Sequence, residues 1–350
     1  MLLAPLSAMA QDKLRIATYN TELSRDGPGL LLRAIVSGQD EQVEAVAKVI
    51  AAVQPDIILL QNIDYDHDLL ALNALRDRVA VHGHAMIHSF ALPPNTGITT
   101  GFDMNGDGHV ELPKDAQSFG EFVGQGGMAV LSRYEIRENS VQDFSQVLWK
   151  DVPGALLPKT EDGPFPSKDA LDVQRLSSTG HWIVPVATDL GTIHFFAFHA
   201  GPPVFDGPED RNGRRNHDEI VFWQKVMDGK LGEVPEPFVV LGNANLDPLD
   251  GEGIKEAIRS LLADPRLQDP QARRPQLVSR TAEHSGDPAF HTVAWPLDGP
   301  GHKRVSYILP DTFFSVVASG VHWPREVSAA GKIAAKASRH RLVWVDVTWD

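Results

Sequence analysis

Several polar side chains directly follow apolar runs, where strands end, and their types are those that bind metals and phosphates. "IATYN" ends in Asn20, "DIILLQN" ends in Asn62, and "HFFAFHA" carries His199. "FVVLGNANLDP" places Asn243 and Asn245 two residues apart. Amide oxygens coordinate hard cations, and imidazoles transfer protons near neutral pH. Functional groups of layered α/β proteins gather where strand ends meet loops, so these residues are candidates for one site.

The C-terminal part of the chain carries a second set of such groups. "KRVSYILP" places Ser306 inside an apolar strand pattern, and "SRHRLVWVDV" places Arg339 and His340 before the last strand. Alone, a histidine between two arginines is typical of a solvated basic patch. Its position before a strand makes His340 a candidate catalytic group instead.

Three arginines lie at the start of a helix pattern in "DRNGRRNHDE". Backbone amides at a helix N-terminus and the forked guanidinium groups of Arg211, Arg214 and Arg215 are suited to binding a phosphate of the substrate. An exposed, charge-balanced helix end is the alternative, and we keep both interpretations.

"FDMNGDGHVEL" has the spacing of a calcium loop. Asp103, Asn105 and Asp107 alternate, a glycine stands at the sixth position, and the carbonyl of His109 is the seventh. The twelfth position is Lys114, where a bidentate glutamate belongs. A weak Ca²⁺ site and a plain Asx/Gly turn are therefore both open.

Strands and helices that alternate along the chain must position these groups. Alternating or fully apolar runs predict strands over residues 13–20, 56–62, 127–133, 180–188, 192–200, 237–243, 304–310 and 341–349. Apolar residues at helical spacing predict helices over residues 42–54, 64–81, 212–227 and 253–263. Pro- and Gly-rich segments near 90–120, 145–178 and 265–300 are interpreted as insertions. We therefore expect one α/β domain over residues 11–350, with two packed sheets covered by helices.

The composition limits the possible functions. A net charge of −14 argues against a broad basic face for long nucleic acids, which we disfavour without excluding them. A small or exposed anionic ester is compatible with it. The chain has no cysteine, which excludes disulfides and thiolate chemistry. No apolar stretch approaches the ~20 residues of a membrane span.

The first ten residues have the pattern of a signal-peptide remnant. "LLAPLSAMAQ" is apolar and places Ala8 and Ala10 at the −3 and −1 positions of an A-x-A-like cleavage site. The usual basic start is missing, and a frayed apolar N-terminus is the alternative. We expect a secreted or periplasmic protein.

The order of these motifs resembles the endonuclease/exonuclease/phosphatase superfamily, the DNase I-like hydrolases of phosphate esters. The resemblance runs from about Leu14 to Val347. It implies a four-layer α/β sandwich that hydrolyses a phosphodiester or phosphomonoester with Mg²⁺ or Mn²⁺. By position, His199 and His340 match the two catalytic histidines, and Asn245 matches the phosphate-orienting amide. Asn20 matches the first metal-shell residue.

Four positions depart from the family motifs. Asn62 stands where a metal-binding Glu belongs, and Asn243 stands where the water-activating Asp belongs. Ser306 and Arg339 each replace an Asp. An amide cannot accept a proton at neutral pH, and losing a general base typically costs ~10²–10⁴ in rate. A natural loss and an engineered change at residue 243 are both compatible with the sequence.

Neighbouring acids are candidates to replace the missing metal ligands. Glu22 follows Asn20 by two residues, and Asp64 begins an acidic stretch after Asn62. Acids at a helix start also favour the helix dipole, which is the structural alternative for Asp64. We therefore expect a metal-dependent phosphate-ester hydrolase, impaired by Asn243. The alternative is a catalytically degenerate relative that binds a phosphate or a protein partner.

Overall fold

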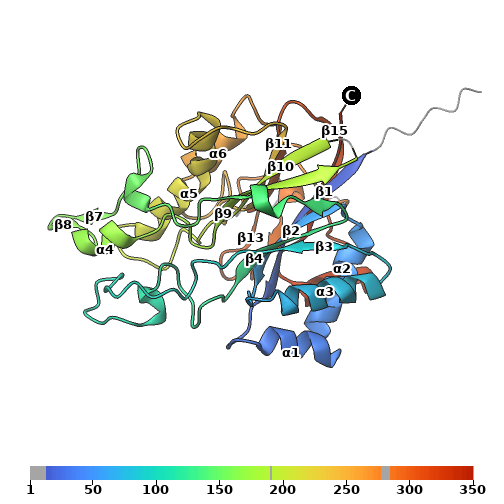
Figure 1. The fold of residues 1–350 in the computed structure, drawn as a ribbon, viewed down its shortest axis with the longest axis horizontal. Coiled ribbons are helices and arrows are strands. Elements are labelled where there is room, and N and C mark those ends of the chain that lie inside the picture. The colour runs from blue at the N-terminus through green and yellow to red at the C-terminus, as the bar shows by residue number, and fades with distance from the viewer. Residues whose placement is uncertain (1–12, 190, 277–283, 350) are drawn as a thin grey trace, which may run out of the picture.

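The structure is a computed structural model, which describes residues 13–189, 191–276 and 284–349. The predicted signal remnant at residues 1–10 lies outside them. Two six-stranded sheets pack against each other, and helices cover their outer faces (Figure 1). The result is an α/β sandwich of four layers, as the family resemblance implied.

The first sheet contains the N-terminal and C-terminal strands. Its order is β15-β16-β1-β2-β4-β3. β1 and β2 run parallel, whereas β16 pairs antiparallel with β1. The bounds of its strands are β1 Leu14–Leu23, β2 Ile57–Ile63, β3 His88–Phe90, β4 Gly127–Ser132, β15 Ser315–Val321 and β16 Val343–Thr348.

The second sheet has the order β14-β11-β10-β9-β5, with β6 also paired to β9. β10 and β11 run parallel, and β14 is antiparallel to β11. Its strands are β5 Glu135–Ile136, β6 Gln142–Asp143, β9 His181–Thr188, β10 Gly191–His199, β11 Phe238–Asn243 and β14 Ser306–Pro310. Two separate two-stranded ribbons pair β7 (Lys159–Thr160) with β8 (Gly163–Pro164) and β12 (Val293–Ala294) with β13 (His302–Lys303).

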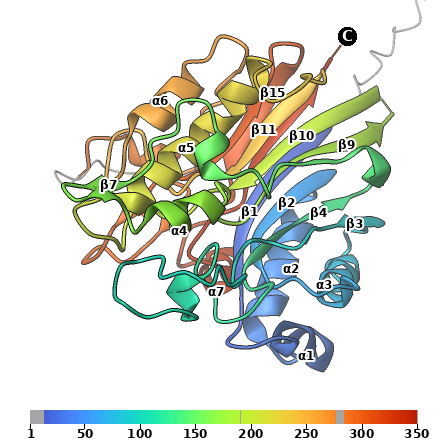
Figure 2. The ribbon, with the colours of Figure 1, turned by 60° about the vertical axis from the view of Figure 1, so that its left-hand side comes forward.

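Helices form the two outer layers (Figure 2). α1, α2, α3 and α7 cover the first sheet, and α5 and α6 cover the second. Their bounds are α1 Leu30–Ser37, α2 Glu41–Val53, α3 Leu70–Val81, α4 Lys168–Val173, α5 Arg211–Met227, α6 Glu256–Leu262 and α7 Ala329–Ala337. A third cluster of buried apolar side chains lies between the sheets, including Ile16, Leu59 and Phe195. Within the described residues, no helix is both long and apolar enough to cross a membrane.

The helix expected over residues 64–81 begins later than the apolar pattern indicated. α3 starts at Leu70, because the carboxylate of Asp66 accepts the N–H groups of Leu70 at 2.7 Å and Ala71 at 2.8 Å. The acidic stretch is thus a turn that precedes the helix, in which a carboxylate binds the unpaired N–H groups of the first turn.

Two parallel strand pairs end on the same side of the sandwich. Asn20 pairs with Gln61 near the end of β1 and β2, and His199 pairs with Asn243 at the end of β10 and β11. Glu22 and Asn62 lie at a shift in the pairing register near the ends of β1 and β2, and Asn245 follows β11. All three adopt left-handed backbone conformations, with φ between 50° and 55°. Such conformations are uncommon outside glycine, and at Glu22 and Asn62 they interrupt the regular strand pairing beside the site.

Candidate active site

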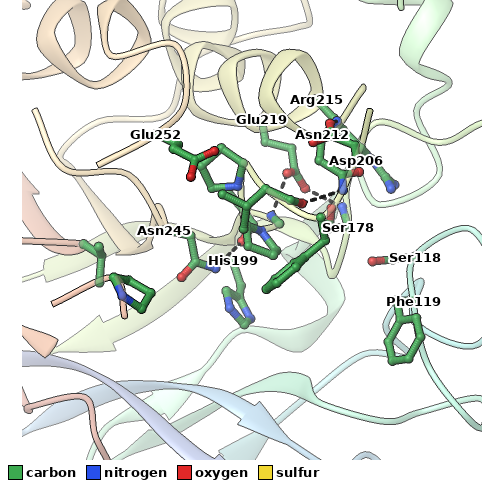
Figure 3. A pocket seen from close by; sticks show the side chains of 18 of the residues that line it. Ser118, Phe119, Ser178, His199, Asp206, Asn212, Arg215, Glu219, Asn245 and Glu252 are labelled. Carbon is green, nitrogen blue, oxygen red and sulfur yellow. Dashed lines mark hydrogen bonds between the residues drawn. The ribbon is translucent and has the colours of Figure 1, made fainter. Parts of the chain in front are cut away.

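A cleft of about 1250 Å³ lies at these strand ends (Figure 3). Most of the residues singled out in the sequence line it together. These are Asn20, Glu22, Asn62, Asn105, Arg211, Arg215, His199, Asn245, Arg339 and His340. Asn243 lies beneath the surface and contacts two of them.

Asn243 links His199 to Asn245. Its amide nitrogen lies 3.4 Å from Nε2 of His199 and donates to Oδ1 of Asn245 at 3.2 Å. Its amide oxygen accepts the backbone N–H of Asn245 at 3.1 Å. Because the amide nitrogen can only donate, Nε2 of His199 must be the unprotonated acceptor in this arrangement.

His199 is accordingly a neutral imidazole. Burial lowers its pKa to about 4. Its other ring nitrogen lies 3.5 Å from the hydroxyl of Thr179, which fits a tautomer protonated at Nδ1. Asn245 is oriented from the opposite side, because its amide nitrogen donates to the carbonyl of Ala200 at 2.9 Å.

His340 lacks the partner that a catalytic histidine usually has. Its Nδ1 atom and the hydroxyl of Ser306 are both buried and have no hydrogen-bond partner among the described residues. Both residues pack beside the same short segment: the Ser306 N–H donates to Thr292 at 3.1 Å, and His340 pairs with Val293. Burial lowers the pKa of His340 to about 3. The serine at residue 306, where the family motif has an aspartate, brings no charge to this buried region.

Glu22 forms an ion pair with Arg339 on the other wall. One carboxylate oxygen accepts from Nε of Arg339 at 2.7 Å and also from Nη2. The other accepts the backbone N–H of Arg339 at 2.7 Å and the hydroxyl of Ser338 at 3.0 Å. Burial raises the pKa of Glu22, but the hydrogen bonds from Arg339 outweigh burial and hold the pKa below its usual value.

The predicted metal ligands do not fit a hard divalent cation as they are arranged. Glu22 is the one carboxylate among Asn20, Glu22 and Asn62, and both of its oxygens are taken by Arg339 and Ser338. Oδ1 of Asn20 faces the Glu22 N–H at 3.3 Å. Mg²⁺ is typically held by one or two carboxylates with near-octahedral geometry. Across the described part of the chain, no three His, Asp or Glu side chains are grouped to hold a metal ion.

Asp64 lies outside the cleft lining. Its two oxygens accept the backbone N–H groups of Arg25 at 2.8 Å and Gly126 at 2.9 Å. The carboxylate thus ties two loops together behind Asn62, and the structure does not bring it to the predicted metal position.

The three arginines of α5 have different surroundings. Arg215 is 4% exposed and donates to the carbonyls of residues 175–177, so its guanidinium shapes the cleft wall. Arg211 donates to the carbonyl of Met104, and its Nε has no partner in the described residues. Arg214 does not line the cleft and donates to the carbonyl of Glu209. Arg211 is therefore the best placed of the three to contact a ligand.

The loop with calcium-like spacing is closed by its own backbone. The carboxylate of Asp103 accepts the N–H groups of residues 105–108, and Asp107 pairs with Lys114. Asn105 also contacts this group, and the N–H of His109 donates to Asp107 at 2.9 Å. This geometry is that of the Asx turn that the sequence left as an alternative.

Sequence reasoning missed Glu219, a buried carboxylate in the cleft wall. It is fully buried, yet it accepts the N–H groups of Ser178 and Gly201 (Figure 3). Burial raises its pKa to about 6, against the opposing charge of Arg215. The sequence did indicate that Glu219 is buried, because Arg215 and Glu219 share the inward face of α5 with Phe222 at helical spacing.

Residues 17–340 match the family model of the endonuclease/exonuclease/phosphatase family. The chain therefore belongs to this family. Its fold is similar to that of an endonuclease/exonuclease/phosphatase from Beutenbergia cavernae, with a TM-score of 0.57 and 19% identity, covering 96% of this chain and 72% of that one. A family protein from Leptotrichia buccalis gives a TM-score of 0.54 at 16% identity, covering 96% and 100%. A third, from Bacteroides thetaiotaomicron, gives 0.51 at 15%, covering 98% and 100%. No curated protein matches the sequence significantly.

Proposed function

We propose that the chain binds a phosphate ester in this cleft and hydrolyses it slowly. The observation that carries the proposal is the convergence of His199, Asn243, Asn245 and His340 at the strand ends. The imidazole of His340 and the amide of Asn245 line the cleft and are suited to contact phosphate oxygens and to stabilise charge that develops on them, while Asn243 and Thr179 hold His199 behind them. Membership of the family supports phosphate esters as the substrate class.

The slow rate follows from residue 243. The amide of Asn243 donates a hydrogen bond where the family's aspartate would accept a proton, and among the described residues no hydrogen bond to Nδ1 orients His340. A missing general base typically costs ~10²–10⁴ in rate. The chain therefore retains the groups that bind phosphate better than those that activate water.

Members of this family generally depend on a divalent metal ion, and Mg²⁺ or Mn²⁺ is the ion that the resemblance implies. The pairing of Glu22 with Arg339 opposes that expectation for this chain. An assay with each ion and with a chelator is needed to measure the dependence.

A small or exposed ester is the proposed substrate. Acidic side chains, including Asp206, Glu252 and Asp250, line the cleft and would repel the continuous phosphates of a long nucleic acid. From the sequence of residues 1–10 we further propose that the protein acts outside the cytoplasm.

The second candidate is a catalytically degenerate relative that binds a phosphate or a protein partner without turnover. The hydrogen bonds that Asn243 makes with its neighbours favour it, because they satisfy the amide without any charge.

The test is hydrolysis of bis(p-nitrophenyl) phosphate and p-nitrophenyl phosphate by the wild type, Asn243→Asp and the double variant Asn243→Asp/Ser306→Asp. Each is assayed with Mg²⁺, Mn²⁺, Ca²⁺ or EDTA. We expect weak turnover by the wild type and at least tenfold faster turnover by a restored variant. If the three proteins bind the ester but none of them hydrolyses it, the chain is a catalytically degenerate relative that only binds. If no ester is bound or hydrolysed, the proposed function is wrong.

A further inference from the structure

Arg339 places a permanent positive charge in the wall of the cleft. It lies next to His340, and its side chain is 60% exposed although it forms an ion pair. The two hydrogen bonds to Glu22 come from Nε and Nη2, so one edge of the guanidinium plane faces the carboxylate. In the described part of the chain no hydrogen bond involves Nη1. The opposite edge is therefore available to a ligand in the cleft.

We propose that the guanidinium of Arg339 takes the place of the divalent cation, so that this cleft binds the phosphate of its ester without metal. The inference rests on the proposed phosphate-ester function. The side chains at the expected metal position do not suit the divalent cation that the family generally uses. Glu22, the one carboxylate there that could bind a cation, already neutralises Arg339.

Glu22 acts as the positioning residue in this arrangement. It holds the side-chain edge of Arg339, and it also accepts the backbone N–H of the same residue at 2.7 Å. Ser338 donates to the same oxygen as that N–H, at 3.0 Å. A guanidinium fixed in this way loses little further side-chain entropy when it binds two phosphate oxygens.

A guanidinium reproduces only part of what a metal does. It neutralises phosphate charge and orients the oxygens, but it does not lower the pKa of a bound water as a metal ion does. Replacement of the metal by Arg339 therefore agrees with a cleft that still binds the phosphate ester but hydrolyses it slowly. Lys303 and Arg211 line the same cleft and offset part of the repulsion from its acidic side chains, such as Asp206 and Glu252.

The binding test uses phenyl phosphate and isothermal titration calorimetry on the full chain, with EDTA and with Mg²⁺. We expect wild-type affinities that agree within about twofold. Arg339→Gln should weaken binding roughly tenfold or more, because a charge-assisted hydrogen-bonding pair is lost. The matched control is Arg33→Gln, which removes an exposed arginine of α1 outside the cleft lining and should not change affinity.

A variant designed to bind a metal ion also tests whether Arg339 occupies the place of the cation. Arg339→Asp frees Glu22 and adds a second carboxylate beside it, so Mn²⁺ should bind this variant at least tenfold more tightly than the wild type. The readout is the loss of the free-Mn²⁺ electron paramagnetic resonance signal, with Arg33→Asp as the charge-matched control. Melting curves establish that each variant is folded.

Two results would overturn the inference: loss of wild-type phenyl phosphate binding in EDTA, or wild-type affinity in Arg339→Gln. Both differ from failure of the proposed function, in which no phosphate ester binds with or without metal.

Discussion

The side-chain nitrogen of Asn243 lies 3.4 Å from Nε2 of His199, on adjacent residues of the parallel strands β10 and β11. An aspartate at residue 243 would instead present an oxygen, which accepts a proton or a hydrogen bond from the ring. Burial keeps this imidazole neutral, and residue 243 determines whether the protonated ring would have an acceptor.

Asn243→Asp should raise the pKa of His199 from its depressed value of about 4 by roughly 1–3 units, because a carboxylate favours the protonated ring. NMR titration of the histidine ring protons measures this shift. Asn139→Asp makes the same chemical change at an exposed residue and should leave the His199 titration unchanged. An unaltered His199 pKa in Asn243→Asp would show that the two side chains are not coupled.

Ser306→Asp should give His340 a charged partner. The Ser306 hydroxyl and the Nδ1 atom of His340 are buried without partners beside the same segment, so a carboxylate should raise the His340 pKa from about 3 by roughly 1–3 units. The same NMR titration reports it. Ser306→Asn, similar in size but uncharged, is the control and should produce a much smaller shift. Equal shifts in both variants would contradict an electrostatic cause.

Glu219→Gln should destabilise the fold. Both carboxylate oxygens accept backbone N–H groups, from Ser178 and Gly201, and the amide nitrogen of glutamine would face one of these donors. A buried unsatisfied donor costs about 1–3 kcal/mol. Urea unfolding measures the change, with the exposed Glu138→Gln as the control. A stability equal to that of the wild type would mean that the loop of Ser178 rearranges freely.

The protein should lose stability as the pH falls from about 6.5 toward 4. Burial lowers the pKa of His181 to about 4, of His199 to about 4 and of His340 to about 3, whereas the unfolded chain titrates near 6.5. In this window the unfolded state binds more protons, so stability decreases on the order of 1 kcal/mol per pH unit for each buried histidine. Glu219 has the opposite effect between about 6 and 4.5, because its pKa is raised in the folded state.

Urea midpoints measured from pH 7 to pH 4.5 test this dependence. His181→Phe should reduce the slope, since the ring is buried among Phe198, Phe222 and Trp223. His67→Asn should not, because the His67 side chain is 96% exposed. A pH-independent midpoint would contradict the assignment of these histidines as buried and neutral.

The parts of the site that follow strands could be predicted from the sequence. Asn20, His199 and Asn243 end apolar runs, and the parallel pairing of those runs brings them to one edge. The pair of Glu22 and Arg339 could not be predicted in this way, because 317 positions separate the residues and each has a plausible role as a loop charge. Only the approach of the first and last strands places them together.

The sequence patterns did not predict helices α1 and α7, and the reasons lie in their local sequences. α1 begins after Gly29 and has no side-chain cap, so its start carries no signal beyond its apolar spacing. α7 begins after Ser328, whose hydroxyl accepts the N–H of Gly331, and it is rich in alanine. That serine is a recognisable helix start, but the short length and internal glycine of α7 weaken the helical pattern.

The left-handed backbone at the strand ends has a consequence for how the chain could evolve. Asn62 has a φ of 55°, a conformation that asparagine tolerates better than most residues with longer side chains. Replacing it with the family's glutamate would therefore carry a conformational cost on the order of 1 kcal/mol, in addition to any effect on ligands. The main chain therefore opposes a glutamate at this residue only modestly, because Glu22 already adopts the same conformation at φ 50°.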